Sequence, residues 1–376
     1  MTHNIVLIRS NPVRPYPRLE KMANCLIKHG YGVQVLAWDR DNDYEPRKEE
    51  LKLTNGTAEI TRIGIKGQFS GGIKKNLKGL LKFQSFIRKW LVKNQNSYSV
   101  IHAYDFDTGY TAMKCAKKLK KKFVYDIPDY YVDSHGLYDS LIGKLVKSCE
   151  DNVITRSDAT IICTEERKQQ IKDASPKKLI VVHNTPAETV EPVQKAPSDR
   201  LKLVYVGIFG KKRFIDKIAQ AVSMRSDCEF HIGGYGGNME QYFQDMADKF
   251  ENIYYYGRIP YDKTLELENE CDVMCAMYDP SVRNHYYAAP NKFYEALMLG
   301  KPLLMVKKTG MSAIVEENNF GEVIDYNEDA LNRALDKLAA NRESFAGISI
   351  MEKKYYSANY SWEMMEKRII NLYESL

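Results

Sequence analysis

The feature that most constrains the fold is a repeated alternation of short apolar runs with segments of helical spacing. Residues 4–9 are apolar, a proline-containing loop follows, residues 19–29 have helical spacing up to Gly30, and residues 32–37 are apolar again. Strand, loop, helix and strand in this order open a parallel α/β sheet. The sequence therefore predicts a sheet that binds ligands at the carboxyl ends of its strands.

The alternation continues to about residue 182 and begins again after residues 186–200, a proline-containing stretch without periodicity. We interpret that stretch as a linker. A chain of 376 residues can fill two cores of about 150 to 200 residues each. The predicted fold class is α/β, with one Rossmann-like domain at residues 1–190 and a second at residues 191–353.

In the second half of the chain, four predicted strands end in glycine-rich or basic turns or loops. These are residues 207–213, residues 233–237, residues 257–260 and the loop before Pro290. Glycine lets the backbone approach a ligand closely, and turn N–H groups bind anions. Four such turns in succession predict a nucleotide-binding domain.

The last of these turns leads into a stretch that reads APNKFYEALMLGKP. Pro290 is acceptable at the start of a helix, and Gly300 suits a left-handed C-terminal cap. The helix would offer free N–H groups beside Asn291 and Lys292, with the carboxylate of Glu295 one turn deeper. This combination suits an anion that carries hydroxyl groups. The alternative is that Lys292 and Glu295 are only a solvated pair.

The net charge of +6 conceals an asymmetry between the two halves of the chain. Residues 1–190 carry a net charge of +11, and residues 191–376 carry −5. Residues 51–100 hold ten basic residues and one acidic residue. One basic half predicts an anionic surface or ligand at that half, and it does not predict a nucleic-acid-binding protein.

Part of this charge lies in residues 73–93, which alternate leucine, phenylalanine and tryptophan with lysine and arginine and contain no acidic residue. A basic amphipathic helix is typical of a membrane-surface contact. The alternative is a helix whose apolar side packs into the domain and whose basic side faces water.

Several patterns are missing from the sequence. It contains no run of 18 uncharged apolar residues and no secretory signal at its start, so we expect a cytoplasmic protein. Its seven cysteines are scattered and form no C-x-x-C pair, so we expect reduced core residues. Its histidines form no H-E-x-x-H motif, and the sequence predicts neither a metal site nor a cofactor.

Candidate ligand contacts in the first half follow predicted strands. Arg14 and Arg18 lie in the loop after the first strand, and Asp105, Asp126 and Asp129 follow two later strands. Since the carboxyl ends of parallel strands share one edge of the sheet, these side chains are candidates for binding a substrate.

A series of short motifs runs along the whole chain: VIHAYD at 100–105, VYD at 124–126, HNTP at 183–186, YVG at 205–207, IGGYG at 232–236, YGRIP at 256–260, PNKFYEALMLGKP at 290–302 and YSW at 360–362. In this order and spacing the chain resembles the retaining family 4 glycosyltransferases, which have the GT-B fold of two Rossmann-like domains facing across a cleft. The resemblance implies that the nucleotide sugar binds the C-terminal domain and the acceptor the N-terminal domain. It also implies that a last helix, residues 354–376, returns to the N-terminal domain.

The resemblance assigns roles in the donor site. Glu295 matches a glutamate that binds ribose hydroxyls, and Arg213, with Lys212 or Lys211 as alternates, matches the lysine that binds the diphosphate. The other donor contacts implied are Gly207 and Gly234 in the strand-end turns, Arg258 and Ile259 beside the base, and Pro290, Asn291 and Lys292 under the diphosphate. The catalytic candidates are Glu295, Arg213, Lys212 and Asp129, and the acceptor candidates are Arg14, Arg18 and Asp105.

The sequence departs from the family pattern at three positions. Tyr287 stands where a first glutamate is usual, Ile208 where an arginine often follows the glycine, and Pro128 where a histidine is often found. Two alternatives to a transferase follow. One is a nucleotide-sugar epimerase, and the other is a non-catalytic nucleotide-binding subunit of a partner transferase.

The function that we expect is a retaining glycosyltransferase that moves a sugar from a UDP-sugar to a saccharide acceptor without a metal. The basic amphipathic segment favours a lipid-linked acceptor and a place on the inner face of an anionic membrane, in the assembly of a cell-surface glycan.

Overall fold

The computed structural model describes residues 4–67, 72–187, 190 and 198–376, with side chains from residue 75 onward in the second of these ranges. Most of the predicted linker and the side chains of Ile73 and Lys74 lie outside the described residues. The chain forms two compact units. Unit 1 comprises residues 1–183 and 365–376, and unit 2 comprises residues 184–364.

Unit 1 is built on an eight-stranded sheet in the order β3-β4-β2-β1-β5-β6-β7-β8. All neighbours are parallel except β3 and β4, which form an antiparallel hairpin at one edge. The strands are β1 (Asn4–Arg9), β2 (Gly32–Asp39), β3 (Tyr44–Leu53), β4 (Gly56–Gly64), β5 (Val100–Tyr104), β6 (Lys122–Ile127), β7 (Ala159–Ile162) and β8 (Leu179–Val181).

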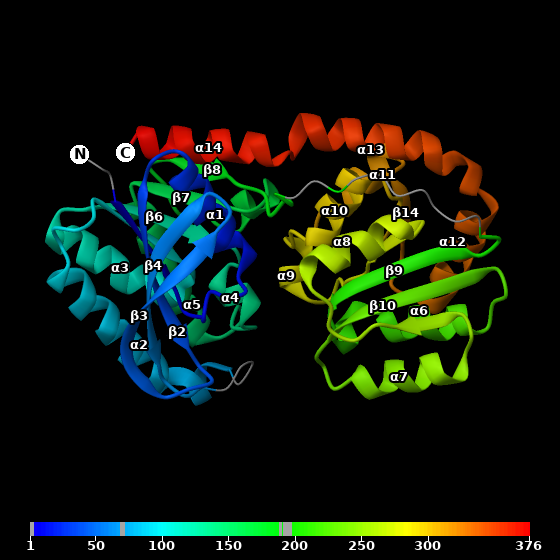
Figure 1. Ribbon diagram of the computed structural model, residues 1–376, viewed down its shortest axis with the longest axis horizontal. Coiled ribbons are helices and arrows are strands. Elements are labelled where there is room, and N and C mark those ends of the chain that lie inside the picture. Colours follow the sequence, from blue (N-terminus) through cyan, green and yellow to red (C-terminus); the bar gives the residue numbers. More distant parts are fainter. Residues whose placement is uncertain (1–3, 68–71, 188–189, 191–197) are drawn as a thin grey trace. The chain divides into compact units, whose positions relative to one another are not determined.

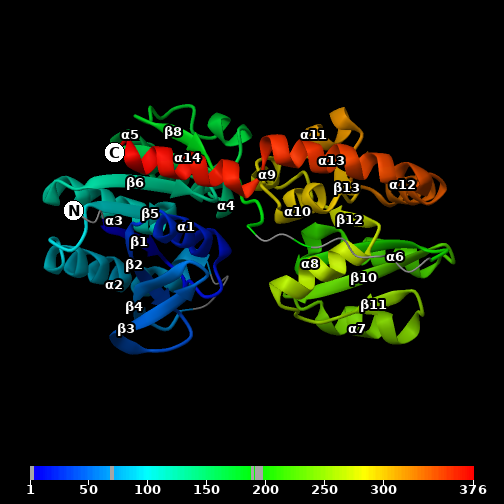
Figure 2. The ribbon, with the colours of Figure 1, turned by 45° about the horizontal axis from the view of Figure 1, so that its top comes forward.

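Helices cover this sheet, as Figures 1 and 2 show. They are α1 (Pro17–Lys28), α2 (Gly72–Lys93), α3 (Asp105–Leu119), α4 (Tyr131–Ser134) and α5 (Leu141–Arg156), with a short 3-10 turn at Glu166–Gln169. Helix α3 packs between α2 and α5, so these three lie side by side. Their apolar side chains and those of the strands form one core.

Unit 2 is built on a six-stranded parallel sheet in the order β11-β10-β9-β12-β13-β14. The strands are β9 (Leu201–Ile208), β10 (Cys228–Tyr235), β11 (Ile253–Tyr255), β12 (Val273–Ala276), β13 (Leu303–Val306) and β14 (Gly321–Ile324). The helices are α6 (Ile215–Ser223), α7 (Glu240–Lys249), α8 (Tyr261–Glu270), α9 (Arg283–Tyr286), α10 (Asn291–Leu299), α11 (Ser312–Asn318), α12 (Glu328–Ala340) and α13 (Phe345–Asn359).

The predicted α/β class with two Rossmann-like sheets is confirmed. In unit 2, α6, α7 and α12 contribute to one core cluster and α8, α10 and α11 to another. The two clusters lie on opposite faces of the sheet, because alternate residues of a strand point to opposite sides. Because neighbouring strands are parallel, their carboxyl ends and the loops that follow them lie along one edge of the sheet.

The unit boundaries lie at residues 183 and 364, whereas the sequence analysis placed them at 190 and 353. Helix α13 stays with unit 2 because Tyr360, just beyond it, packs against Phe293 and Tyr294. The return to unit 1 occurs within the last helix, α14 (Trp362–Glu374). There Tyr373 Oη lies 2.6 Å from His102 Nδ1, within hydrogen-bond distance.

Candidate functional site

The candidate site of unit 2 lies where the strand order reverses. Strand β9 pairs with β10 on one side and with β12 on the other. The chain passes from β9 to β10 and later returns across the sheet to β12, so the connections leave β9 in opposite directions. Open α/β sheets bind ligands outside the carboxyl ends of the strands at such a point. Gly207 lies at that end of β9.

The backbones of Gly207 and Gly234 meet at this point. The two residues pair across β9 and β10, and a Cβ atom on Gly234 would lie 1.8 Å from the carbonyl oxygen of Gly207. Gly234 has φ +137°, a conformation that side chains rarely adopt, and its N–H donates to the Gly257 carbonyl at 2.7 Å. Only glycine fits at Gly234, because a side chain there would collide with the Gly207 carbonyl. Without side chains at these two positions, a ligand can approach the backbone closely.

The basic turn after β9 is attached to the loop after β12. It forms a short 3-10 turn, Lys211–Arg213, in which Lys211 and Lys212 are exposed. The Arg213 guanidinium lies 4.3 Å from the ring centroid of Tyr278, and the Asp279 N–H donates to the Lys212 carbonyl at 3.0 Å. Three cationic side chains therefore stand at the switch point, which suits a diphosphate.

Arg258 and Ile259 lie at the neighbouring strand end. The Arg258 guanidinium is 4.5 Å from the ring centroid of Tyr235, the last residue of β10. A Cβ atom on Gly233 would lie 3.2 Å from Cδ1 of Ile259. The structure thus brings the turn after β11 against the end of β10, where the family resemblance implies a contact with the base.

Helix α10 confirms the helix predicted between Pro290 and Gly300. It spans Asn291–Leu299, Pro290 is its N-cap residue, and Gly300 ends it in the left-handed conformation with φ +68°. No side chain caps its N-terminus. Its first residue, Asn291, is exposed and accepts a hydrogen bond from the side-chain amide of Asn184. The first N–H groups of α10 are thus available to an anion.

Lys292 and Glu295 are not the solvated pair of the alternative interpretation. Glu295 is 2% exposed, the Lys292 side chain is 11% exposed, and the ammonium lies 3.9 Å from Oε2 of Glu295. Lys292 also lies 3.6 Å from Oε1 of Glu268, a residue of α8 that is fully buried. Glu268 was not among the predicted site residues, because nothing in its own segment distinguishes it from the exposed acidic residues around it.

Glu268, Lys292 and Glu295 form a cluster in which burial and charge shift the pKa values of Glu268 and Lys292. Burial, together with the negative charge of Glu295, raises the pKa of Glu268 well above its usual range, against the lowering effect of Lys292. Burial lowers the pKa of Lys292, but Glu268 and Glu295 raise it by more, so the net shift is upward. Neither carboxyl oxygen of Glu268 has a hydrogen-bond partner among the described residues. The cluster therefore holds one ammonium beside two buried carboxyl groups, and burial favours the protonated form of Glu268.

The cluster lies against the end of β9. The Lys292 ammonium is 5.3 Å from the ring centroid of Tyr205, and Cε of Lys292 would be 3.7 Å from a Cβ atom on Gly207. A cation, the helix N-terminus and a carboxylate thus meet the glycine backbone at one place, a set suited to phosphate and ribose.

In unit 1, the predicted acceptor contacts differ in how exposed they are to solvent. Arg14 is exposed. Arg18 is buried, bonds the Asp126 carboxylate at 2.8 Å, and donates to the Val182 carbonyl at 3.0 Å. Arg18 is thus the ion-pair partner of a fully buried carboxylate in this structure, and its role as an acceptor contact stays a prediction. That carboxylate belongs to Asp126, another of the candidates.

The remaining candidates of unit 1 are ion-paired. Asp105 pairs with Arg9, and each side chain is 15% exposed. Asp129, a catalytic candidate, pairs with Arg167 at 3.0 Å and keeps 56% of its side chain exposed. The side chain of Asp105 is therefore less accessible to a ligand than that of Asp129.

The carboxyl ends of β1, β2 and β5 also bring together Ser10, Arg40 and Asp107, which were not among the predicted site residues. Ser10 donates to Asp107 at 2.9 Å, and the Arg40 guanidinium donates to the Ser10 carbonyl at 2.8 Å. Asp107 follows the VIHAYD motif by two residues, so its position after a strand was an available signal. This polar edge is the part of unit 1 best placed to meet a hydroxyl-bearing substrate.

The three departures from the family pattern have different surroundings. Tyr287 is 8% exposed with its ring centroid 4.9 Å from that of Tyr286, and Ile208 is 53% exposed. The carbonyl of Pro128 accepts a hydrogen bond from Cys163 Sγ at 3.2 Å. A buried tyrosine thus occupies the position of the usual first glutamate.

The described residues contain neither a metal-binding group nor a membrane-spanning helix. Within the described ranges, no three His, Cys, Asp or Glu side chains are grouped so that they could hold a metal ion. In the same part of the chain, no helix is long and apolar enough to cross a membrane.

Comparison with protein families identifies the two halves separately. Residues 18–185 match the model of Glycosyltransferase Family 4, and residues 187–374 match that of Glycosyl transferases group 1. The chain belongs to the group 1 glycosyl transferases. No curated protein matches the sequence in a direct comparison.

Solved structures of similar fold include proteins from several sources. Sucrose-phosphate synthase from Thermosynechococcus elongatus is 14% identical with a TM-score of 0.78, over 99% of this glycosyltransferase and 98% of that chain. Anabaena HepE in complex with UDP and glucose is 12% identical with a TM-score of 0.70, over 100% of both chains. The lipopolysaccharide outer core galactosyltransferase WaaB is 14% identical with a TM-score of 0.60, over 99% of both chains. At these identities the likeness establishes the GT-B fold.

Proposed function

We propose that this glycosyltransferase transfers a sugar from a UDP-sugar to a saccharide acceptor with retention of configuration and without a metal ion. One observation carries the proposal. The switch point of unit 2 joins the Gly207 and Gly234 backbones, the cationic turn ending at Arg213, and the uncapped N-terminus of α10 above the buried Glu295. The glycine backbones suit a nucleotide that lies close to them. The cationic turn and the helix N-terminus suit its diphosphate, and Glu295 suits its ribose hydroxyls. The fold neighbour HepE was solved with UDP and with UDP-glucose.

The chemistry follows from these charges. The bond between the anomeric carbon and the diphosphate oxygen breaks, and the acceptor oxygen forms a bond to the same carbon from the same face. The acceptor proton passes to the departing phosphate oxygen, so no protein base is assigned. Arg213, Lys212 and the α10 N–H groups stabilise the charge that develops on the diphosphate. The same groups would neutralise the diphosphate in place of a divalent cation.

Calorimetric titration with UDP in excess EDTA tests the donor site. We expect binding to persist, and complete metal dependence would contradict the proposal. Arg213→Ala is the informative variant, and Arg333→Ala, an exposed change on α12, is its control. Incubation with a panel of UDP-sugars and saccharide acceptors, followed by mass spectrometry and anomeric NMR, then tests transfer and retention. A free sugar or an altered donor formed without any acceptor would instead indicate an epimerase.

A non-catalytic nucleotide-binding subunit is the second candidate. It is favoured by Tyr287, whose buried ring occupies the position of a carboxylate in the family. Under this alternative, UDP binds, no donor and acceptor pair reacts, and a partner transferase restores turnover. Turnover by the purified chain alone rules it out.

We also propose that the acceptor is lipid-linked and that unit 1 contacts the inner face of an anionic membrane during the synthesis of a cell-surface glycan. The contact is smaller than the sequence suggested, because Phe83, Ile87 and Trp90 of α2 belong to the core of unit 1. Leu77 and Leu81, 47% and 54% exposed, remain beside exposed lysines of the same helix. A cation near an anionic leaflet contributes about 1 kcal/mol.

Flotation with vesicles tests this contact. Wild type should bind vesicles that contain phosphatidylglycerol at low salt, and Lys75, Lys78 and Lys82 changed together to Glu should release it. The control changes Leu141 and Leu145 of α5, which are 84% and 67% exposed, to Ser. If only the α5 change releases the protein, the membrane contact lies on α5. If wild type does not bind these vesicles, the proposal of a lipid-linked acceptor loses its structural support.

A further inference from the structure

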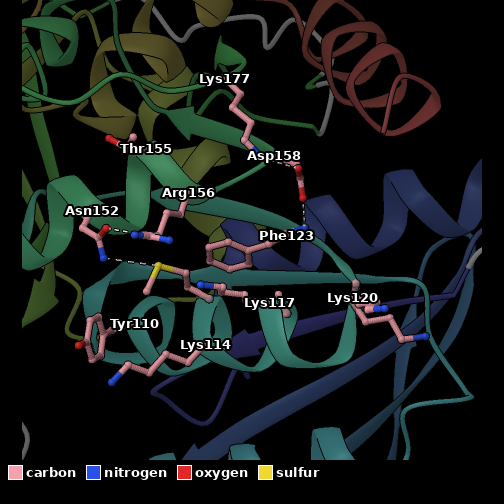
Figure 3. A pocket seen from close by; sticks show the side chains of 13 residues that line it. Tyr110, Lys114, Lys117, Lys120, Phe123, Asn152, Thr155, Arg156, Asp158 and Lys177 are labelled. Atoms are coloured by element: carbon pink, nitrogen blue, oxygen red, sulfur yellow. Dashed lines mark hydrogen bonds and ion pairs between the residues drawn. The ribbon is translucent and has the colours of Figure 1, made fainter.

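A cavity of about 610 Å³ lies in unit 1 between α3 and α5. Its lining residues come from three further parts of the fold, namely β6, the turn before β7 and the segment before β8. None of them is a candidate residue of the donor or acceptor site. Figure 3 shows the α3 side chains on one side of the cavity and those of α5 on the other, with Phe123 of β6 between them.

The cavity has an apolar floor and a cationic rim. Met113, Ala116 and Phe123 form the floor and are 7%, 3% and 2% exposed. The rim carries Lys114, Lys117, Lys120 and Lys121 from α3 and the turn after it, Arg156 from α5, and Lys177 before β8. The lining contains a single acidic residue, Asp158.

Contacts within the cavity use only part of this cationic charge. Asp158 is already paired with Lys177 at 3.0 Å and accepts from the Phe123 N–H at 2.9 Å. Arg156 Nε donates to Asn152 at 2.6 Å, which leaves the outer nitrogens of the guanidinium available. Lys117 and Lys120 are exposed and form no ion pair within the described ranges.

The helix dipoles do not account for so much charge. The C-termini of α3 and α5 lie at this cavity, since Leu119 and Arg156 end the two helices. Each helix end contributes roughly half a negative charge. Against six cationic residues, Asp158 and the two helix ends leave an excess of about four positive charges. Cations this close together repel one another unless an anion lies among them.

We propose that this cavity binds a phosphate-bearing ligand, either a small free molecule or the headgroup of an anionic lipid. Phosphate oxygens would accept from Lys117, Lys120 and Arg156, and the apolar floor would take the non-phosphate part of the ligand. The site adds to the donor site and does not depend on it. Asp105, an acceptor candidate, is the first residue of α3. A ligand in the cavity would therefore contact the helix that carries this candidate.

Two arms of one experiment test the site and distinguish the two sources. Calorimetric titration with inorganic pyrophosphate, in saturating UDP so that the donor site is occupied, tests the free ligand. Cosedimentation with vesicles of phosphatidylcholine, with and without phosphatidylglycerol, tests the headgroup. The variant is Lys117→Glu with Lys120→Glu, and its matched control is Lys52→Glu with Lys367→Glu, which makes the same charge change at exposed positions elsewhere in unit 1.

We expect the Lys117 and Lys120 variant to bind at least tenfold more weakly in one arm, and the control to stay within twofold of wild type. Loss in the pyrophosphate arm identifies a free phosphate-bearing ligand, and loss in the vesicle arm alone identifies a headgroup. If wild type binds neither probe, or if variant and control lose binding equally, the cavity is not a phosphate site. Failure of the donor assignment is separable, because no donor-site residue is changed. Circular dichroism of both variants verifies that they are folded.

Discussion

Replacing Lys292 with methionine should destabilise unit 2 substantially. Methionine keeps most of the apolar length of the lysine side chain and removes the ammonium. That ammonium lies 3.9 Å from Glu295 and 3.6 Å from Glu268, which are 2% and 0% exposed. We expect Glu268 to hold a proton, because burial raises its pKa well above its usual range, and Lys292 and Glu295 then form a neutral pair. The substitution leaves the Glu295 carboxylate buried without this cation.

The magnitude follows from the geometry. Two unit charges 3.9 Å apart interact by about 4 kcal/mol at an effective dielectric constant of about 20. Removing one partner of a buried pair typically costs about 3 to 5 kcal/mol. In a unit of this size, about 1 kcal/mol corresponds to a shift of roughly 2 to 4 °C in Tm. We therefore expect the Tm of unit 2 to fall by roughly 6 to 20 °C.

Two further variants isolate the cause. Glu268→Gln keeps the shape and the neutral state of the protonated acid, so its free energy of unfolding should stay within about 1 kcal/mol of wild type. The double change Lys292→Met with Glu295→Gln removes both charges and should recover part of the loss, because no unpaired carboxylate remains.

Scanning calorimetry of the whole chain without nucleotide measures these effects, and the transition that UDP shifts in wild type identifies unit 2. A Tm for Lys292→Met within about 2 °C of wild type would mean that the cluster is not held together by charge. If Glu268→Gln is as damaging as Lys292→Met, Glu268 is ionised and shares the ammonium. Either result would refute the assignment of protons given above.

Three further predictions concern other residues. Arg213→Ala should lower the affinity for UDP more than that for uridine in calorimetric titrations, and an equal loss for both ligands would contradict its role at the diphosphate. Glu352 is fully buried, and burial raises its pKa to about 9. Its contribution is therefore complete below the unfolded pKa of about 4.5 and is lost as pH rises through about 9. Denaturation between pH 5 and 9 should show a slope of up to about 1.4 kcal/mol per pH unit that Glu352→Gln removes, and an unchanged slope would assign the pH dependence elsewhere. Arg18→Ala should lower the Tm of unit 1 by removing the guanidinium partner of Asp126, with UDP affinity unchanged, whereas an unchanged Tm with a raised acceptor KM would support Arg18 as a ligand contact.

Local sequence signals predicted the elements that carry the candidate site. Pro290 and Gly300 bounded α10 correctly, because a proline at a helix start and a left-handed glycine at its end act within a few residues. The hairpin of β3 and β4 was not predicted, although Asn55 and Gly56 form a turn signal at the start of β4. The spacing of Lys292 and Glu295 placed them on neighbouring turns, and that placement holds.

Burial was the property that local signals assigned least well. The apolar side of α2 is equally compatible with a membrane and with a protein core, and only the neighbouring strands and α3 show that Phe83 and Trp90 face the core. The same amphipathic pattern left Leu77 and Leu81 exposed. A helix pattern reports which residues share a face, but not what covers that face.

The sequence by itself determined the β/α alternation, the division into two Rossmann-like units and the ends of α10, because these depend on interactions between residues close in the chain. Only the tertiary structure decided that Arg18 is committed to Asp126, that Glu268 joins Lys292 and Glu295, and that cations from separate segments surround one cavity. The physical reason is that the state of a charged group depends on its burial and on the charges within a few ångströms. Those neighbours come from distant parts of the chain, and folding alone brings them together.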